Sequence, residues 1–407
     1  MPSAVAKRDL CTESQRATVL SVFTGVGGLD LGLEAASFSS VGCVELDQTA
    51  RRSLKQNRGE DWPLVGADVA EVAEWLTPSE LLTCDSELTL LAGGPPCQPY
   101  SKAALWSPSS YAGLADPRAT PLHAFLHLVS VFTPRAVLIE NVPGFVQGTN
   151  SAFAVMETAF SGINRVHGTR YRCQVHLVDA LAFGVPQKRT RAIVTAFRDG
   201  EALDLTLAPE ASGGMRAWDA LRDLRTDEPP PEPQGRWADL LASIPEGQNY
   251  LWHTNRGGGM PLFGYRTRYW SFLLKLAKNA PAWTLPAQPG PSVGPFHWEN
   301  RPLRIAEMLR LQSFPGNWVV EGNRREQVRQ VGNATPPLLA EQLGRAIRGA
   351  LRLTGPSGPL KLRIKRARIV PEPEPVKPVP LRYRCLAGEH PDHPGEGLGP
   401  KPRPIGL

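Results

Sequence analysis

Short apolar runs alternate with helical stretches over the first half of the chain. Runs of this length, bounded by turn residues, are typical of buried strands. The runs that we interpret as strands are 19–23, 41–44, 88–92, 136–139, 174–178 and 192–197. Helical patterns lie between them, for example from Leu29 onward and over 69–76. Strands that alternate with helices in this way predict an α/β protein with a parallel, doubly wound sheet.

From about residue 199 this rhythm stops. The next hundred residues contain three consecutive prolines at 229–231, a glycine run at 257–259 and six of the ten tryptophans. Helical patterns return over 303–311 and over 338–351, and Pro337 stands where a first helical turn tolerates proline. We therefore expect a flexible N-terminus at 1–16, a first domain at 17–198, a second, irregular domain at 199–300, and a return to the first domain at 301–355.

The C-terminal part of the chain is rich in proline and glycine, with a Pro-Glu repeat at 371–375. Such composition lacks the apolar side chains needed for a core, so we expect residues 356–407 to be a disordered, basic tail. Five of the eight residues at 361–368 are basic. We favour a solvated linker there over a sequence-independent phosphate contact.

Composition limits the class of protein. The chain has 407 residues, is 42% hydrophobic and has no apolar run of membrane-spanning length. No apolar signal core occurs near Met1, so we expect a cytoplasmic, bacterial, nucleoid-associated location. Six scattered cysteines without a CxxC pair argue against a disulfide framework and against a metal site. The net charge of +6 fits a polyanionic partner, although it also fits an ordinary basic protein.

The strand at 88–92 is followed by the sequence Gly-Gly-Pro-Pro-Cys-Gln, which contains Cys97. Prolines end a strand and fix the backbone. Cys97 is thereby placed at the carboxyl end of a strand, where open α/β sheets bind their ligands. A thiol there is a candidate nucleophile, and a small buried hydrophobic residue is the other interpretation. The local residues leave both open.

The motif Pro95-Pro96-Cys97-Gln98 resembles the catalytic motif of DNA methyltransferases that modify the 5-position of cytosine. The other blocks of that family occur in the family's order between residue 19 and about residue 350. They are Phe23-Thr24-Gly25-Val26-Gly27-Gly28, Glu140-Asn141-Val142, Gln187-Lys188-Arg189-Thr190-Arg191, Arg310-Leu311-Gln312-Ser313-Phe314-Pro315 and Gln330-Val331-Gly332-Asn333-Ala334-Thr335-Pro336-Pro337. The resemblance implies a Rossmann-like methyltransferase fold with a smaller, irregular target-recognition domain.

The resemblance also assigns catalytic roles. Cys97 would add to carbon 6 of the cytosine, because an aromatic ring carbon does not attack a methyl sulfonium unaided. Glu140 would stabilise ring nitrogen 3, and Arg191 would bind the carbonyl oxygen with Arg189 nearby. Two arginines at a spacing of two on an extended segment are expected to share one face. Asn141 is expected to brace the loop that contains Pro96 rather than to touch substrate.

The cofactor site is expected at the glycine-rich turn. That turn, with Glu45 at the end of the next strand, is by itself compatible with NAD and with S-adenosylmethionine. The resemblance selects S-adenosylmethionine. Asp68 would accept a hydrogen bond from the adenine amine, although it can equally cap the helix at 69–76. The cofactor residues that the resemblance implies are Phe23, Gly25, Gly27, Glu45, Leu46, Asp68, Val69, Pro96 and Asn333.

The expected partner is double-stranded DNA. A base inside a duplex cannot reach a buried cysteine, so base flipping is required. The long segment at 101–120 has the composition of a lid, and the second domain interleaves arginine with aromatic residues. The residues expected to bind DNA are Ser101, Lys102, Trp106, Arg256, Arg266 and Arg268. We expect a monomer that belongs to a restriction-modification system, with a restriction endonuclease encoded nearby and no direct contact with it.

Three alternatives remain open at this stage. An RNA cytosine methyltransferase would use the same chemistry, but the large second domain with its many tryptophans favours duplex DNA. A non-catalytic DNA-binding relative would not need Cys97, Glu140 and Arg191 together. An NAD-dependent oxidoreductase would share the glycine-rich turn and leave the motif around Cys97 unexplained.

Overall fold

A computed structural model describes residues 17–83, 86–96, 120–148, 151–205, 214–266 and 269–390. The chain forms two compact units. Unit 1 comprises Met1–Val178, Thr190–Leu207 and Leu339–Lys361, and unit 2 comprises Asp179–Arg189, Ala208–Leu338 and Leu362–Leu407. The first unit is therefore assembled from three separate segments, with the return segment near residue 339 rather than residue 301.

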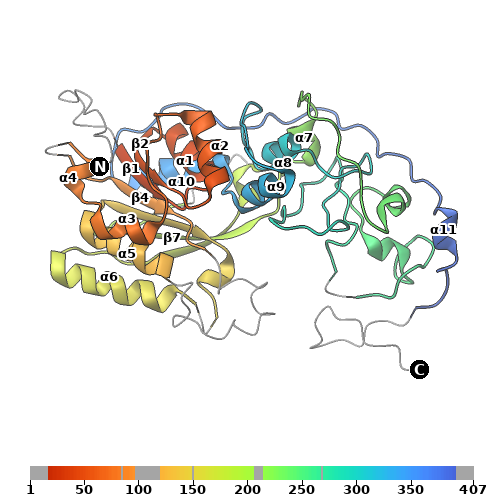
Figure 1. The fold of residues 1–407 in the computed structure, drawn as a ribbon, viewed down its shortest axis with the longest axis horizontal. Coiled ribbons are helices and arrows are strands. Elements are labelled where there is room, and N and C mark those ends of the chain that lie inside the picture. Colours follow the sequence, from red (N-terminus) through yellow and green to blue (C-terminus); the bar gives the residue numbers. More distant parts are fainter. Residues whose placement is uncertain are drawn as a thin grey trace. The chain divides into compact units, whose positions relative to one another are not determined.

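Seven strands form one sheet within the described part of the chain (Figure 1). Their order across the sheet is β3-β2-β1-β4-β5-β7-β6. The strands are β1 Ala17–Val22, β2 Phe38–Val44, β3 Leu64–Gly66, β4 Leu90–Gly93, β5 Ala136–Asn141, β6 Gln174–Asp179 and β7 Thr190–Phe197. The predicted α/β class is confirmed, and all six strands interpreted from the sequence are present.

The sheet is not wholly parallel. The neighbours from β3 to β5 run parallel, whereas β7 lies antiparallel to β5, with Glu140 opposite Ile193 and Asn141 opposite Ala192. The expectation of a parallel sheet is therefore wrong at this edge. Only residues 180–189 connect β6 to β7, and a parallel connection needs a crossover of a dozen or more residues. The short connection reverses the chain instead.

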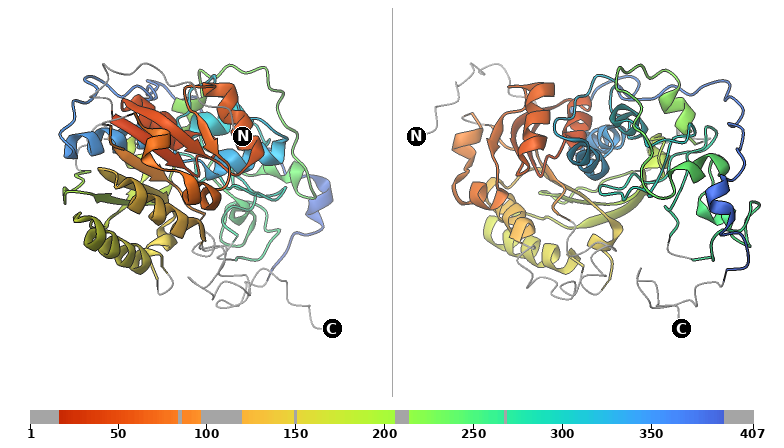
Figure 2. Two further views of the ribbon diagram at one scale, coloured as in Figure 1. Left: turned by 60° about the vertical axis from the view of Figure 1, so that its left-hand side comes forward. Right: turned by 45° about the vertical axis from the view of Figure 1, so that its right-hand side comes forward.

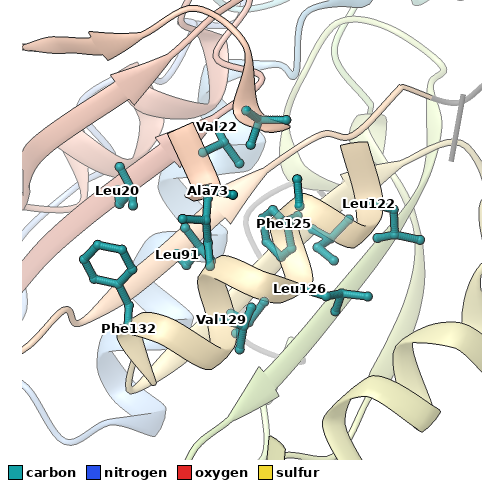
Figure 3. Packing of buried hydrophobic residues seen from close by; sticks show 14 of the residues in the cluster. Leu20, Val22, Ala73, Leu91, Leu122, Phe125, Leu126, Val129 and Phe132 are labelled. Carbon is teal, nitrogen blue, oxygen red and sulfur yellow. The ribbon is translucent and has the colours of Figure 1, made fainter. Parts of the chain in front are cut away.

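Helices cover both faces of the sheet (Figures 1 and 2). On one face, α3 (Val69–Trp75), α5 (Thr120–Phe132) and α6 (Phe153–His167) supply buried apolar side chains. Figure 3 shows Phe125 and Val129 of α5 among side chains from the strands, such as Leu91 of β4. Successive strand residues point to opposite faces, so the apolar runs of the central strands are buried on both sides.

The other face is covered by α1 (Gly28–Ala35), α2 (Gln48–Arg58) and α10 (Pro337–Ala350). Gly344 of α10 lies so close to Ala36 that a β-carbon added to it would stand 2.7 Å from the side chain of that alanine. Arg348 donates a hydrogen bond of 2.9 Å to the carbonyl of Ser37. The short helix α4 (Pro78–Leu81) follows α3. A C-terminal segment thus completes the core of a sheet that begins at residue 17.

Unit 2 has little regular secondary structure in its described residues. Its helices are α7 Ala217–Leu221, α8 Ile305–Leu311, α9 Arg324–Asn333 and α11 Leu381–Arg384. Single-turn 3₁₀ helices occur at η5 Ala180–Phe183, η7 Ala238–Ser243 and η8 Tyr250–His253, and η4 Pro143–Phe145 lies in unit 1. A compact core of aromatic and aliphatic residues lies between these loops, with Leu240, Tyr250 and Phe296 among its buried members. The expected irregular domain therefore has a core of its own.

The residues after α10 do not form the disordered tail that composition predicts for 356–390. This stretch buries Ile364, Ala367, Val379 and Tyr383. All four belong to unit 2. Residues 391–407 lie outside the described part of the chain. No helix within the described ranges is both long and apolar enough to cross a membrane.

Candidate active site

The topology of the sheet indicates where a ligand binds in unit 1. Strand β1 has β2 on one side and β4 on the other, and both pairs are parallel. The chain therefore winds in opposite directions from β1, and the carboxyl ends of β1 and β4 flank a topological switch point. Ligands of open α/β sheets bind at such a crevice. The glycine-rich turn, Glu45, Pro95 and Glu140 all follow or end strands at this edge.

The turn after β1 is held by the carboxylate of Glu45. Its Oε2 accepts a hydrogen bond of 2.6 Å from the amide of Gly25, and its Oε1 accepts one of 2.7 Å from the amide of Asp47. Gly25 has a φ of 58°, and a β-carbon added there would meet nothing within 4 Å. Gly27 is the N-cap of α1 at a φ of 84°. These left-handed conformations are the reason for glycine in the turn, and they leave space beside the backbone of Gly25.

The side chains near this turn fit an adenosine-type ligand. Leu46, directly after Glu45, is 69% exposed. Phe23 is half-buried at a φ of 59° and lies between β1 and the turn. Open space beside Gly25, an exposed apolar side chain and a partly exposed ring next to a carboxylate suit a ligand with an apolar base and a polar sugar.

Asp68 and Val69 have structural positions as well. Asp68 is the N-cap of α3, and its Oδ1 accepts a hydrogen bond of 2.8 Å from the amide of Ala70. The capping role weighed in the sequence analysis is thus present. Val69 is buried in the core of unit 1. Any contact of this pair with a ligand is additional to these roles.

A buried carboxylate behind the turn was missed by the sequence analysis. Asp30 lies in the first turn of α1 and is 3% exposed. Burial raises the pKa of Asp30 to about 6, and the negative charge of Glu45 adds to the effect. The thiol of Cys43 lies 3.8 Å from Asp30 Oδ1 and can donate to it. The signal in the sequence was an aspartate in an otherwise apolar helix start.

The segment after β4 is packed closely against β1 and β5. A β-carbon on Gly93 would stand 2.5 Å from the carbonyl oxygen of Val22, and one on Gly94 would stand 3.2 Å from that of Glu140. Glycine is therefore required at 93 and favoured at 94 because backbone occupies the space of a side chain. Asn141 donates a hydrogen bond of 2.8 Å to the carbonyl of Pro95. As expected from the sequence, Asn141 braces this loop.

Glu140 and Arg191 form a buried ion pair. Arg191 Nε lies 2.9 Å from Glu140 Oε1, and the two side chains are 11% and 8% exposed. The antiparallel register explains the contact, because Ile193 is opposite Glu140 and Arg191 lies two residues further on the same face. The reversal of β7, which the sequence analysis did not foresee, therefore brings the arginine to the carboxylate.

Arg189 has different partners from Arg191, contrary to the expectation from their spacing. Strand β7 begins at Thr190, so Arg189 lies before it in the turn, where alternation no longer applies. Its side chain is 1% exposed and donates two hydrogen bonds of 2.9 Å to the carbonyls of Gly332 and Ala334. Arg189 thus holds the C-terminal end of α9 within unit 2. Its catalytic role stays a prediction.

Several predicted residues lie outside the described part of the chain. They are Cys97, Ser101, Lys102, Trp106 and Arg268. Two described cysteines are poorly suited to act as nucleophiles. Burial raises the pKa of the Cys43 thiol well above its ordinary value and that of Cys173 to about 12. Both thiols stay protonated at neutral pH, and the thiolate is the reactive form.

Of the remaining predicted residues, Pro96 belongs to unit 1 and is exposed. Asn333, Arg256 and Arg266 belong to unit 2, and Asn333 is exposed at the last position of α9. The guanidinium of Arg256 lies 3.8 Å from the ring centroid of Tyr265, and that of Arg266 lies 5.9 Å from the ring of Tyr269. These two arginines are therefore associated with aromatic rings, as their interleaving suggests.

Comparison with known proteins gives a consistent result. Residues 17–349 match the family described as C-5 cytosine-specific DNA methylase. The chain is 35% identical over 367 residues to the Type II methyltransferase M.SacI of Streptomyces achromogenes, covering 81% of this chain and 92% of the relative. It is 32% identical to the Type II methyltransferase M.NaeI of Lentzea aerocolonigenes, covering 84% and 77%. A solved S. pombe Dnmt2 methyltransferase has the same fold, with a TM-score of 0.54 at 16% identity, covering 83% and 99%.

Proposed function

The chain belongs to the C-5 cytosine-specific DNA methylase family, and on that premise we propose that it methylates carbon 5 of a cytosine within a specific sequence of duplex DNA. The observation that carries the proposal is the buried pair of Glu140 and Arg191, 2.9 Å apart at the end of β5. Asn141, the next residue, braces the loop that leads to Cys97. A carboxyl group, a cation and a thiol are the groups that this reaction needs.

Cys97 starts the reaction in this proposal. Its thiolate forms a bond to carbon 6 of the cytosine, and the electron pair of the 5,6 double bond moves into the ring toward nitrogen 3. Glu140 stabilises nitrogen 3 by donating a proton or a hydrogen bond. Arg191 binds the carbonyl oxygen of the base and, from its position beside Glu140, keeps the carboxyl group in place. When bound, S-adenosylmethionine would supply a methyl group to carbon 5 and leave as the thioether S-adenosylhomocysteine. A base then removes the proton from carbon 5, and the bond between Cys97 and carbon 6 breaks.

We assign the cofactor to the crevice beside Gly25 and Gly27. Glu45, which holds the amides of Gly25 and Asp47, is the acceptor that we assign to the ribose hydroxyls. Phe23 and Leu46 provide apolar surface for the adenine, and Asp68 provides an acceptor for the adenine amine. Pro96, Val69 and Asn333 complete the proposed set, with Asn333 toward the methionine end.

We propose that unit 2 binds the DNA while the target base is flipped out of the helix. Arg256 and Arg266 lie beside aromatic rings, and arginine is the commonest side chain to read guanine in the major groove. The Type II relatives suggest the biological role, which is protection of host DNA in a restriction-modification system. A monomer is sufficient for this role, and a restriction endonuclease would act on the same site without contacting this chain.

Bisulfite sequencing of DNA from cells that express the chain tests the proposal. We expect one short sequence motif to carry 5-methylcytosine in cells with the unmodified protein and in no cells with Cys97→Ser. Incubation of purified protein with labelled S-adenosylmethionine and either duplex DNA or transfer RNA provides the second test. Label in transfer RNA alone would refute DNA as the substrate.

A further inference from the structure

The residues after Arg363 lie beyond the family match, which ends at residue 349, yet they are an integral part of unit 2. Here we call residues 364–386 the C-terminal strap. At its start, Ile364 is buried and the amide of Ala367 donates a hydrogen bond of 2.7 Å to Asp219 Oδ1. Arg216 donates to the carbonyl of Ala367 at 2.7 Å and also pairs with Asp219. The strap therefore supplies one of the hydrogen bonds to the buried carboxylate of Asp219.

The middle of the strap is held by a buried lysine. Lys278, whose side chain is 5% exposed, pairs with Glu246 at 3.2 Å and with Glu374 of the strap at 2.7 Å. The carbonyl of Glu372 accepts a further hydrogen bond from Lys278 at 2.9 Å. The amide of Glu374 in turn donates to Glu246 at 2.8 Å. Glu372 and Glu374 of the strap thus bind directly to the buried ion pair between Lys278 and Glu246.

The end of the strap inserts a side chain into the aromatic core. Tyr383 is 3% exposed, and its ring stacks on Trp237 with centroids 5.5 Å apart. Its hydroxyl donates a hydrogen bond of 2.6 Å to the carbonyl of Arg236. The neighbouring Leu381 is 79% exposed. One face of α11 therefore docks on the core, while the other faces solvent.

The same aromatic core holds the backbone of Arg266. Trp237 contacts Phe263 at 4.9 Å between centroids, and Phe263 contacts Tyr250 at 6.0 Å. The hydroxyl of Tyr250 accepts a hydrogen bond of 3.0 Å from the amide of Arg266 and donates one of 2.6 Å to its carbonyl. A continuous path of ring contacts thus leads from Tyr383 to the backbone of the arginine assigned above to base recognition.

We propose that the C-terminal strap is a specificity element of this enzyme, in which Tyr383 is a positioning residue that holds the Arg266 segment in its DNA-reading conformation. This inference rests on the proposed role of unit 2 in DNA recognition. Packed aromatic rings have few alternative arrangements, so loss of the Tyr383 ring frees Trp237 to move. Phe263 and Tyr250 then lose the support that fixes the Arg266 backbone. The variant should therefore weaken base recognition by the Arg266 segment and leave the cofactor site of unit 1 unchanged.

The test compares Tyr383→Ala with Tyr383→Phe and with the exposed control Leu381→Ala in the full-length protein. For Tyr383→Ala we expect the KM for specific duplex DNA to rise about tenfold or more, with a matching loss of discrimination against sites that differ by one base pair. The kcat at saturating DNA and the Kd for S-adenosylmethionine should stay within about twofold. Tyr383→Phe keeps the stacked ring and should recover most of the lost discrimination, and Leu381→Ala should match the unmodified protein.

Unchanged discrimination in Tyr383→Ala would overturn the proposal, and so would an equal loss in Tyr383→Phe or in Leu381→Ala. If Tyr383→Ala does not fold, Glu374→Gln serves instead, because Glu374 is half exposed and its loss should raise the DNA KM about threefold. A normal DNA KM and normal discrimination in that variant would also overturn it. Failure of the proposed function is a separate result, because the unmodified protein would then transfer no methyl group to any duplex.

Discussion

Glu140→Gln is the substitution that most directly tests the active site. Glutamine has the shape of glutamate, so the variant keeps a side chain of the same size beside Arg191 Nε, which lies 2.9 Å from Glu140 Oε1, and removes the negative charge. The variant cannot deliver the proton of a carboxylic acid to ring nitrogen 3. The perturbation therefore separates the chemical role of the group from its role in packing.

The rate of methyl transfer reports the chemical role of Glu140, and the free energy of unfolding reports its role in packing. A positioned general acid contributes about 10² to 10⁴ in rate, which corresponds to about 3–5 kcal/mol in the activation free energy. Glu140→Gln also leaves the buried Arg191 guanidinium without its anion, so it should lower the free energy of unfolding by about 3–5 kcal/mol. Arg191→Met is the complementary variant. It leaves a buried carboxylate without its cation, so it should lower the free energy of unfolding by about 3–5 kcal/mol.

The double variant Glu140→Gln/Arg191→Met removes both charges. It should be more stable than Arg191→Met alone by about 2 kcal/mol, because no buried charge remains unpaired. The assays are single-turnover transfer of labelled methyl groups to duplex DNA, calorimetric binding of S-adenosylmethionine and urea denaturation. A turnover of Glu140→Gln within tenfold of the unmodified protein would refute the acid role. Loss of cofactor binding in that variant would show that Glu140 belongs to the cofactor site.

Four further outcomes are expected. Cys97→Ser should abolish methyl transfer while leaving specific DNA binding largely intact, because a hydroxyl is far less ionised than a thiol; normal turnover would remove Cys97 from the mechanism. Asn141→Ala leaves the carbonyl of Pro95 without its donor and should lower the free energy of unfolding by about 1–3 kcal/mol together with kcat; a stable variant with normal kcat would contradict the bracing role. Burial raises the pKa of Asp30 to about 6, so the folded state keeps a proton that the unfolded chain releases, and stability falls as pH rises from 4 to 6 by up to about 3 kcal/mol. Urea titrations of Asp30→Asn should show a flatter pH dependence in that window, and an identical slope would refute this origin. Arg266→Ala should relax methylation at one or two base pairs, as read by bisulfite sequencing at two salt concentrations, whereas uniformly weaker methylation would make Arg266 a phosphate contact.

The strands that the sequence predicts most clearly are those with a continuous apolar run. Strand β4 and strand β5 are buried on both faces, so nearly every position is apolar and the pattern is unmistakable. Strand β3 was missed because it has only three residues, Leu64–Gly66, and all are partly exposed. The direction of β7 leaves no trace in its own periodicity. The short connection from β6 to β7 determines this direction, and its meaning is clear only once it is known that the two strands are neighbours in the sheet.

The side-chain partners of the arginines could not be predicted for a similar reason. Arg189 and Arg191 have the same chemistry and the same motif, but the strand begins between them at Thr190. The first residue of β7 therefore decides which of the two arginines contacts Glu140. The C-terminal strap was missed because its anchors, such as Val379 and Tyr383, are isolated among prolines and charges. Composition averages over such single residues, whereas docking depends on each of them.

The position of α10 has a consequence for how the protein is made. Ile347 of this helix is buried, and Gly344 packs against the residues that follow α1. Strand β1 leaves the ribosome long before this helix does, since about 330 residues separate Val22 from Ala350. At synthesis rates of about 5–20 residues per second, this face of the sheet lacks its last helix for roughly 15–65 s. During that interval the nascent chain presents apolar surface to chaperones, so truncated translation products of this enzyme are expected to be insoluble rather than partly active.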